Sequence, residues 1–119
     1  MDFNEIISDM VKSIPGGIAA VIMAGDGISV AEYLKDGENL DINSLGVEYA
    51  HILQEAKHAS NLLEAGSLDE VTISTSSVNI LLRLISNDYL IALVISPDGN
   101  SGRARYLLRL TASKLSGEF

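Results

Sequence analysis

Cysteine and tryptophan are both absent from this 119-residue chain. The missing cysteines exclude a disulfide framework and thiolate chemistry, and they leave two histidines as the only imidazole ligands for a metal. Proline occurs only twice, and aromatic residues make up 5% of the chain. With so few rings, we expect an interior filled by aliphatic side chains rather than a ligand pocket. The length suits one core, so residues 1–119 are expected to form a single domain.

Basic residues are scarce as well, with eight Lys and Arg against 16 Asp and Glu. The imbalance lies in residues 1–70, which hold thirteen acidic and three basic residues, whereas residues 71–119 hold three acidic and five basic ones. Such a surface disfavours nucleic acid and anionic lipid as partners. No apolar run approaches the roughly 18 residues of a membrane span, so no membrane insertion is expected. The N-terminus lacks the basic region of a secretion signal, which predicts a cytoplasmic protein.

Apolar periodicity and turn residues divide the chain into eight expected elements. Asp2 and Glu5 resemble a capping box at the start of the first helix, and Gly66 is expected to close the long middle helix. The very short links between the last three strands favour an antiparallel meander. Helices are expected over 3–14, 44–65 and 101–115, and strands over 18–24, 28–34, 69–76, 78–86 and 89–96.

Three of these strands, 18–24, 78–86 and 89–96, are apolar with almost no alternation. Both faces of their sheet must therefore be covered. Three helices are available, so we expect the two terminal helices on one face and the long middle helix on the other. The predicted fold class is a three-layer α/β/α sandwich with a five-stranded antiparallel sheet, in the chain order α-β-β-α-β-β-β-α.

Gly25-Asp26-Gly27 follows the first strand and invites comparison with a phosphate-binding loop. A dinucleotide fingerprint needs a third glycine where Val30 stands, and it needs a helix where this sequence continues as a strand. The lysine of a P-loop is missing too. Glycines that tolerate positive φ between two strands instead predict a tight turn.

Several stretches together resemble the roadblock/dynein light chain domain family, of the kind found as small-GTPase regulators in bacteria and archaea. The resemblance spans nearly the whole chain. It rests on the opening helix that ends at IPGGIAAVIM, the hairpin DGISVAEY, the small-residue-rich middle helix, the strands EVTIST and YLIALVI, and the ending PDGNSGRARYLLRL.

This resemblance implies a dimer that binds other proteins and has no enzymatic centre or cofactor of its own. In the family two domains pair edge to edge, which gives one continuous sheet with the two long helices packed antiparallel above it. Some members are subunits of motor or lysosomal scaffold complexes. Bacterial and archaeal members are often associated with Ras-like GTPases, sometimes as activating partners.

The residues themselves indicate where such a dimer would form. The strand of Val71, Thr72, Ile73, Ser74 and Thr75 is predicted at an edge of the sheet, yet it carries neither charge nor proline. Edge strands of natural proteins usually carry charged residues, proline or a bulge that prevent another strand from adding to them. Because this strand lacks charge and proline, it is expected to pair with its copy in a second chain.

On the middle helix, Ala59 and Leu62 are expected to join the dimer interface, because a small residue permits close helix approach. The exposed side of this helix also carries Val47 as a candidate contact for a partner. The opposite side is expected to face the sheet, and its residues are Leu45, Tyr49, Ile52, Ala56 and Leu63.

His51, Glu55 and His58 share one face of the middle helix and invite a metal-site interpretation. We expect them instead to form its solvated polar face, which is available to a partner. Residues 36–43 are rich in oxygen ligands but lack the glycine and the final glutamate of a calcium loop.

Arg103 and Arg105 fall in the first turn of the last helix, where the helix dipole disfavours cations. One interpretation pairs them with acids such as Asp98 or those of the N-terminal half. The other is an acid-recognising patch for a partner. An inserted arginine finger is a third interpretation.

Two function classes follow from the sequence, a protein-interaction module and a sensor domain. The favoured one is a non-enzymatic, dimeric interaction module that regulates or scaffolds a Ras-like small GTPase; one form of regulation is GTPase activation by reshaping the switch loops of the partner. The alternatives are a structural adaptor subunit of a larger complex and a small-molecule sensor domain.

Overall fold

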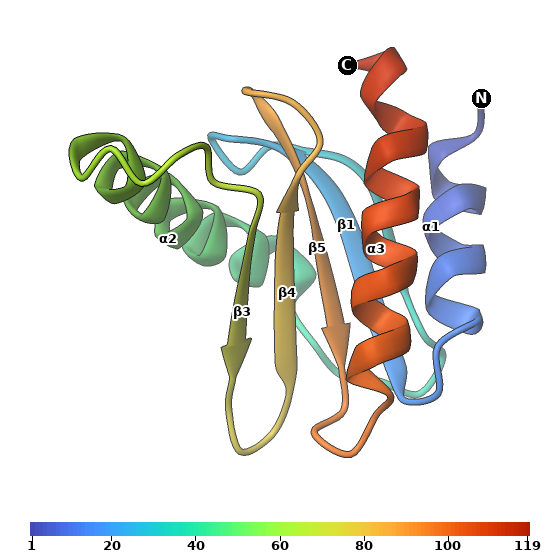
Figure 1. The fold of residues 1–119 in the computed structure, drawn as a ribbon. Coiled ribbons are helices and arrows are strands. Elements are labelled where there is room, and N and C mark those ends of the chain that lie inside the picture. The colour runs from blue at the N-terminus through green and yellow to red at the C-terminus, as the bar shows by residue number, and fades with distance from the viewer.

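The computed structural model describes all residues, 1–119, as three layers built around one antiparallel sheet (Figure 1). None of the three helices combines the length and the apolar character that a bilayer crossing requires. In chain order the elements are α1 (Phe3–Lys12), β1 (Gly17–Ala24), β2 (Ser29–Leu34), α2 (Ile42–Leu62), β3 (Glu70–Ser74), β4 (Asn79–Leu84), β5 (Tyr89–Ile95), α3 (Ser101–Leu115) and a short 3₁₀ turn (Ser116–Glu118).

The strand order in the sheet is β2-β1-β5-β4-β3, and every neighbouring pair is antiparallel. Strands β1 and β5 lie in the middle and are buried along almost their whole length. Strands β2 and β3 form the two edges. The predicted element order, antiparallel sheet and edge position of β3 are therefore confirmed.

The core has two halves, one on each face of the sheet. On one face α1 and α3 lie side by side, and their apolar residues pack against inward-facing residues such as Ile22, Leu81 and Ile91. On the other face α2 packs against residues such as Val21, Leu82 and Leu90. Alternate residues along each strand enter opposite halves, which explains why the central strands carry unbroken apolar runs. The predicted placement of the helices is confirmed.

Local side-chain caps fix the helix starts. Asp2, Asp41 and Asn100 each accept a hydrogen bond from the backbone N–H three residues on, which satisfies an otherwise unpaired donor. The turn at 25–27 is also as predicted. Gly27 has a φ of 91°, and its N–H donates to the Ala24 carbonyl.

The middle helix differs from the prediction at both of its ends. It starts at Ile42 rather than Ser44, because Asp41 is the capping residue. It stops at Leu62, ahead of the expected closure by Gly66. Glu64 takes the left-handed conformation with a φ of 52°, and the next N–H bonds back to the Ser60 carbonyl. A glycine was therefore not needed to end the helix.

The predicted sheet-facing side of α2 is partly wrong. Ile52 is 42% exposed and Leu63 is 74% exposed, whereas Leu53 is completely buried. The buried residues of this helix are Ile42, Gly46, Ala50 and Leu53. Apolar residues occur all round α2, so periodicity alone did not single out the side that meets the sheet.

Candidate functional site

The free edge of β3 is the first candidate surface. Strand β3 pairs only with β4, and its residues from Val71 to Ser74 are half-buried or exposed and uncharged. Helix α3 packs over β4 and β5, so no helix lies closely over β3 on that face. The opposite edge, β2, carries the charged Glu32.

Hydrogen bonds at the two ends of β3 show which backbone groups point away from the sheet. The Thr75 N–H donates to the Val78 carbonyl, and the Leu84 N–H donates to the Asp69 carbonyl. In an antiparallel pair, residues bonded across the ladder alternate with residues whose N–H and C=O point the other way. The odd-numbered residues of β3 therefore bond to β4. The N–H and C=O groups of Glu70, Thr72 and Ser74 point to the free side.

The outer face of α2 is the second candidate surface. Leu62 is 73% exposed, and Ala59 is exposed one turn before it. Val47, 51% exposed near the start of α2, lies beside Gly27 of the β1–β2 turn, and Ile52 is exposed on a flank of the helix, so both add apolar surface outside the buried side.

His51, Glu55 and His58 also lie on this outer face and are exposed. The structure gathers no group of three or more potential metal ligands in one place. The three side chains are available instead for polar contacts around the apolar residues of α2.

The two candidate arginines of α3 lie in different environments. The Arg103 Nε donates to the Ser13 carbonyl at 2.7 Å, at the end of α1, so this side chain ties α3 to α1. Arg105 reaches toward the sheet, where its Nε donates to the Glu70 Oε2 at 3.2 Å. The predicted pairing with an acid of the N-terminal half thus applies to Arg105, whereas Arg103 bonds to a backbone carbonyl.

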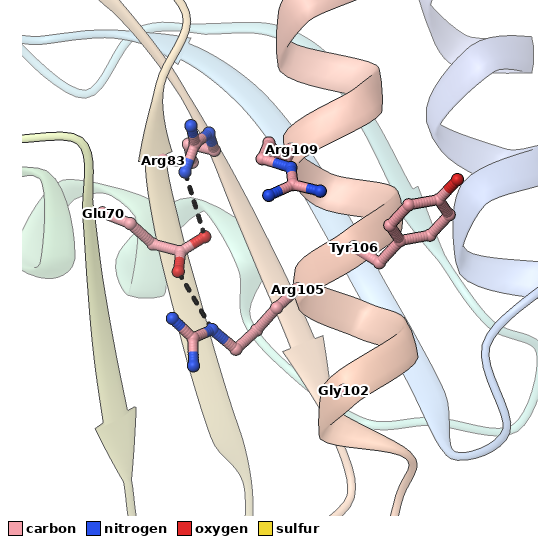
Figure 2. Close-up of a pocket in the computed structure, with 6 residues that line it drawn as sticks. All are labelled: Glu70, Arg83, Gly102, Arg105, Tyr106 and Arg109. Atoms are coloured by element: carbon pink, nitrogen blue, oxygen red, sulfur yellow. Dashed lines mark hydrogen bonds and ion pairs between the residues drawn. The ribbon is translucent and has the colours of Figure 1, made fainter.

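Arg105 is part of a larger pocket between α3 and the β3–β4 hairpin, which Figure 2 shows in close-up. We call it the arginine pocket, and its lining residues are Glu70, Arg83, Gly102, Arg105, Tyr106 and Arg109. Its volume is about 310 Å³. Arg83 and Arg105 approach the Glu70 carboxylate from two sides, with Arg83 Nη1 at 3.6 Å from Oε1.

No pattern in the sequence brought Glu70, Arg83 and Arg109 together with Arg105. The sequence could have indicated the pairing of Glu70 with Arg83, because a two-residue turn after Thr75 fixes the register in which these two residues lie opposite each other. The approach of Arg105 to Glu70 carried no local signal, since it depends on how α3 lies across the sheet.

Comparisons with known proteins add to this geometry. No family model and no curated protein matches the chain. Among solved structures, MglC from Myxococcus xanthus is 38% identical, covers 100% of both chains and has a TM-score of 0.72. A Roadblock/LC7 domain from Streptomyces avermitilis is 13% identical and has a TM-score of 0.88, covering 99% of this chain and 98% of its own. A structure described as MglB with a tetrameric arrangement is 14% identical, with a TM-score of 0.85 over 95% of this chain and 84% of its own.

The family follows from these findings taken with the fold. The fold matches that of a Roadblock/LC7 domain over almost the whole chain, and MglC adds sequence identity over the full length. The resemblance found in the sequence is therefore confirmed: the chain belongs to the Roadblock/LC7 domain family.

Proposed function

We propose that this protein is a non-enzymatic homodimeric module that binds a Ras-like small GTPase in the cytoplasm. The observation that carries the proposal is the free edge of β3, which has no charged residue from Val71 to Ser74. The exposed Ala59 and Leu62 of α2 add apolar surface for a second copy. An edge with several consecutive uncharged residues, such as Val71 to Ser74, is a template for strand addition. Membership of the Roadblock/LC7 family supports the same arrangement.

The proposed dimer joins β3 to β3 of a second copy in antiparallel fashion. In one register Glu70, Thr72 and Ser74 all bond to the second copy. This register places Thr72 opposite Thr72 of the partner subunit, and Glu70 opposite Ser74 of the partner subunit. This pairing would extend the sheet from five strands to ten across the two-fold axis. Leu62 and Ala59, on the outer face of α2, are the residues we expect to reinforce the contact.

Proline substitutions in β3 separate dimer formation from folding. Thr72→Pro removes an N–H on the free side, so the monomer should fold while the edge pairing is lost. Ile73→Pro removes an N–H that bonds to β4, so it should damage the domain itself. The measurement is mass by light scattering, with circular dichroism as the check on folding. A wild-type mass of one chain at micromolar concentration would contradict the dimer.

A single cysteine tests the register, because the chain has no cysteine of its own. In the proposed pairing two Thr72 residues face each other at a Cα separation of about 5.5 Å, which suits a disulfide. Thr72→Cys should therefore form a covalent dimer on mild oxidation. Val30→Cys, an exposed position on the other edge strand, is the matched control and should stay monomeric on denaturing gels.

The GTPase would bind across the platform that the two α2 helices form in this dimer. Val47 and the polar residues His51, Glu55 and His58 are exposed on that face and available to a partner. Any stimulation of GTP hydrolysis would come from reshaping the switch loops of the GTPase, so that its own residues position the water.

Binding and single-turnover hydrolysis with GTPases encoded in the same genome test this part. We expect nucleotide-dependent binding that Val47→Ser weakens. Stimulation that survives alanine at Arg83, Arg103, Arg105 and Arg109 would favour reshaping over an inserted arginine. If no GTPase bound in either nucleotide state, the adaptor alternative would take its place.

A further inference from the structure

The arginine pocket holds an excess of positive charge inside an acidic protein. Three guanidinium groups, from Arg83, Arg105 and Arg109, line the pocket together with the single carboxylate of Glu70, which contacts Arg83 and Arg105, so two positive charges are left over. The whole chain has a net charge of −8. Positive charge is thus concentrated at one place on a surface that elsewhere repels anions.

Hydrogen-bond donors in the pocket are far from saturated. Each guanidinium carries five N–H donors. Glu70 accepts one hydrogen bond, from Arg105, and its ion pair with Arg83 is too long at 3.6 Å to be a second. The Glu70 Oε1 is buried and has no hydrogen-bond partner. Glu70 therefore only partly satisfies the groups around it.

The geometry leaves room for an incoming group. Gly102 contributes no side chain to the pocket, and a Cβ at this position would meet only the Asn100 Oδ1, at 3.7 Å. Two turns further along α3, the Arg109 Cζ lies 5.9 Å from the centre of the Tyr106 ring, and Arg109 forms no ion pair. In Figure 2 the Arg109 side chain extends from α3 toward the side of the pocket where Arg83 lies.

We propose that this pocket binds the carboxylates of an acidic peptide segment in a partner protein. The planar guanidinium fork matches a carboxylate in two parallel hydrogen bonds. Two such carboxylates would balance the two surplus charges. One carboxylate of the peptide would bind between Arg105 and Arg109. Glu70 holds the side chains of Arg83 and Arg105 in place through its two ion pairs.

The same groups argue against larger or more highly charged anions. The Glu70 carboxylate repels a dianionic phosphate more strongly than a singly charged carboxylate. The acidic surface around the pocket disfavours nucleic acid and anionic membranes, whose charge extends over a wide area. A short peptide with two neighbouring acidic side chains suits a pocket of about 310 Å³.

This site lies on the α3 face of the sheet, away from the α2 platform, so it does not rest on GTPase binding. Its Glu70 belongs to β3, the strand that the proposed dimer pairs. The probe is a fluorescein-labelled peptide of alternating Gly and Ser that carries two Asp-Glu pairs, compared with the same peptide carrying Asn-Gln. Binding to the full-length protein is measured by anisotropy at low salt. We expect saturable binding of the acidic peptide that salt weakens, and no binding of its amide counterpart.

Three variants locate the binding in the pocket. Arg109→Gln should weaken it about tenfold, as expected for loss of a hydrogen bond to a charged group. Glu70→Gln should strengthen it, because the competing negative charge is gone; a merely structural role for Glu70 does not predict this gain. Lys114→Gln removes one charge from the same helix outside the pocket and is the matched control.

Thermal melts of each variant confirm folding before binding is compared. Equal binding of the acidic and amide peptides, or equal effects of Arg109→Gln and Lys114→Gln, would overturn the proposal. So would inorganic phosphate that displaces the peptide at lower concentration than a dicarboxylate such as succinate, because the pocket would then be a phosphate site.

Discussion

Two single variants, Leu53→Ala and Ile52→Ala, test which side of α2 the sheet covers, because the free energy of unfolding should fall more for the buried residue. Leu53 is completely buried at the interface with the sheet, whereas Ile52 is 42% exposed on the adjacent side. Leu53→Ala removes three carbon groups at about 0.8 kcal/mol each, or about 2.4 kcal/mol of transfer free energy. The cavity left in the core raises the expected loss of unfolding free energy to about 3–4 kcal/mol.

Ile52→Ala removes the same number of carbons, but from a side chain that water already reaches. No closed cavity forms, and the expected loss is about 1–1.5 kcal/mol. Against a total of about 5–15 kcal/mol for a typical domain, the difference between the two variants is easily measured.

Urea unfolding followed by circular dichroism gives both free energies, and thermal melts should show a fall of about 15 °C for Leu53→Ala. The experiment is repeated over a hundredfold range of protein concentration. If Ile52 touches the second copy in a dimer, its effect will grow with concentration, whereas that of Leu53 will not. Equal losses for the two variants at the lowest concentration would refute the assignment of the buried side.

Three further predictions follow from single side chains. Gly17→Ala should lower the unfolding free energy by about 1–3 kcal/mol, because the added Cβ would lie 2.4 Å from the Val11 carbonyl oxygen; Gly117→Ala, in open space, is the control. The pKa of Asp41 is lowered by its hydrogen bonds from Ser44, so its carboxylate stabilises the folded state above its ordinary pKa of 3.8. That contribution disappears as pH falls through the lowered pKa, and acid titration should show the advantage of wild type over Asp41→Asn shrinking below about pH 4. Phe119→Ala should cost about 1 kcal/mol or more in thermal melts, because the ring packs against two other aromatic rings at 4.6 and 5.2 Å; an unchanged melting temperature would contradict this packing.

Local patterns in the sequence were enough for the elements and their layers. Apolar strands without alternation require cover on both faces, and three helices can provide it in few ways. The last helix is observed over Ser101–Leu115, as predicted, because Asn100 caps it and turn residues precede it. The turn at Gly27 followed in the same way from glycine's tolerance of positive φ.

The tertiary structure alone decided which residues from distant segments meet. The sheet covers one side of α2, and that choice buried Leu53 and exposed Ile52 although both are apolar. The crossing of α3 over the sheet brought Arg105 to Glu70, 35 residues away in sequence, and the contact of Arg103 with Ser13 spans 90 residues. Periodicity describes one element at a time, whereas these contacts depend on how two elements are placed, which the packing of the whole core determines.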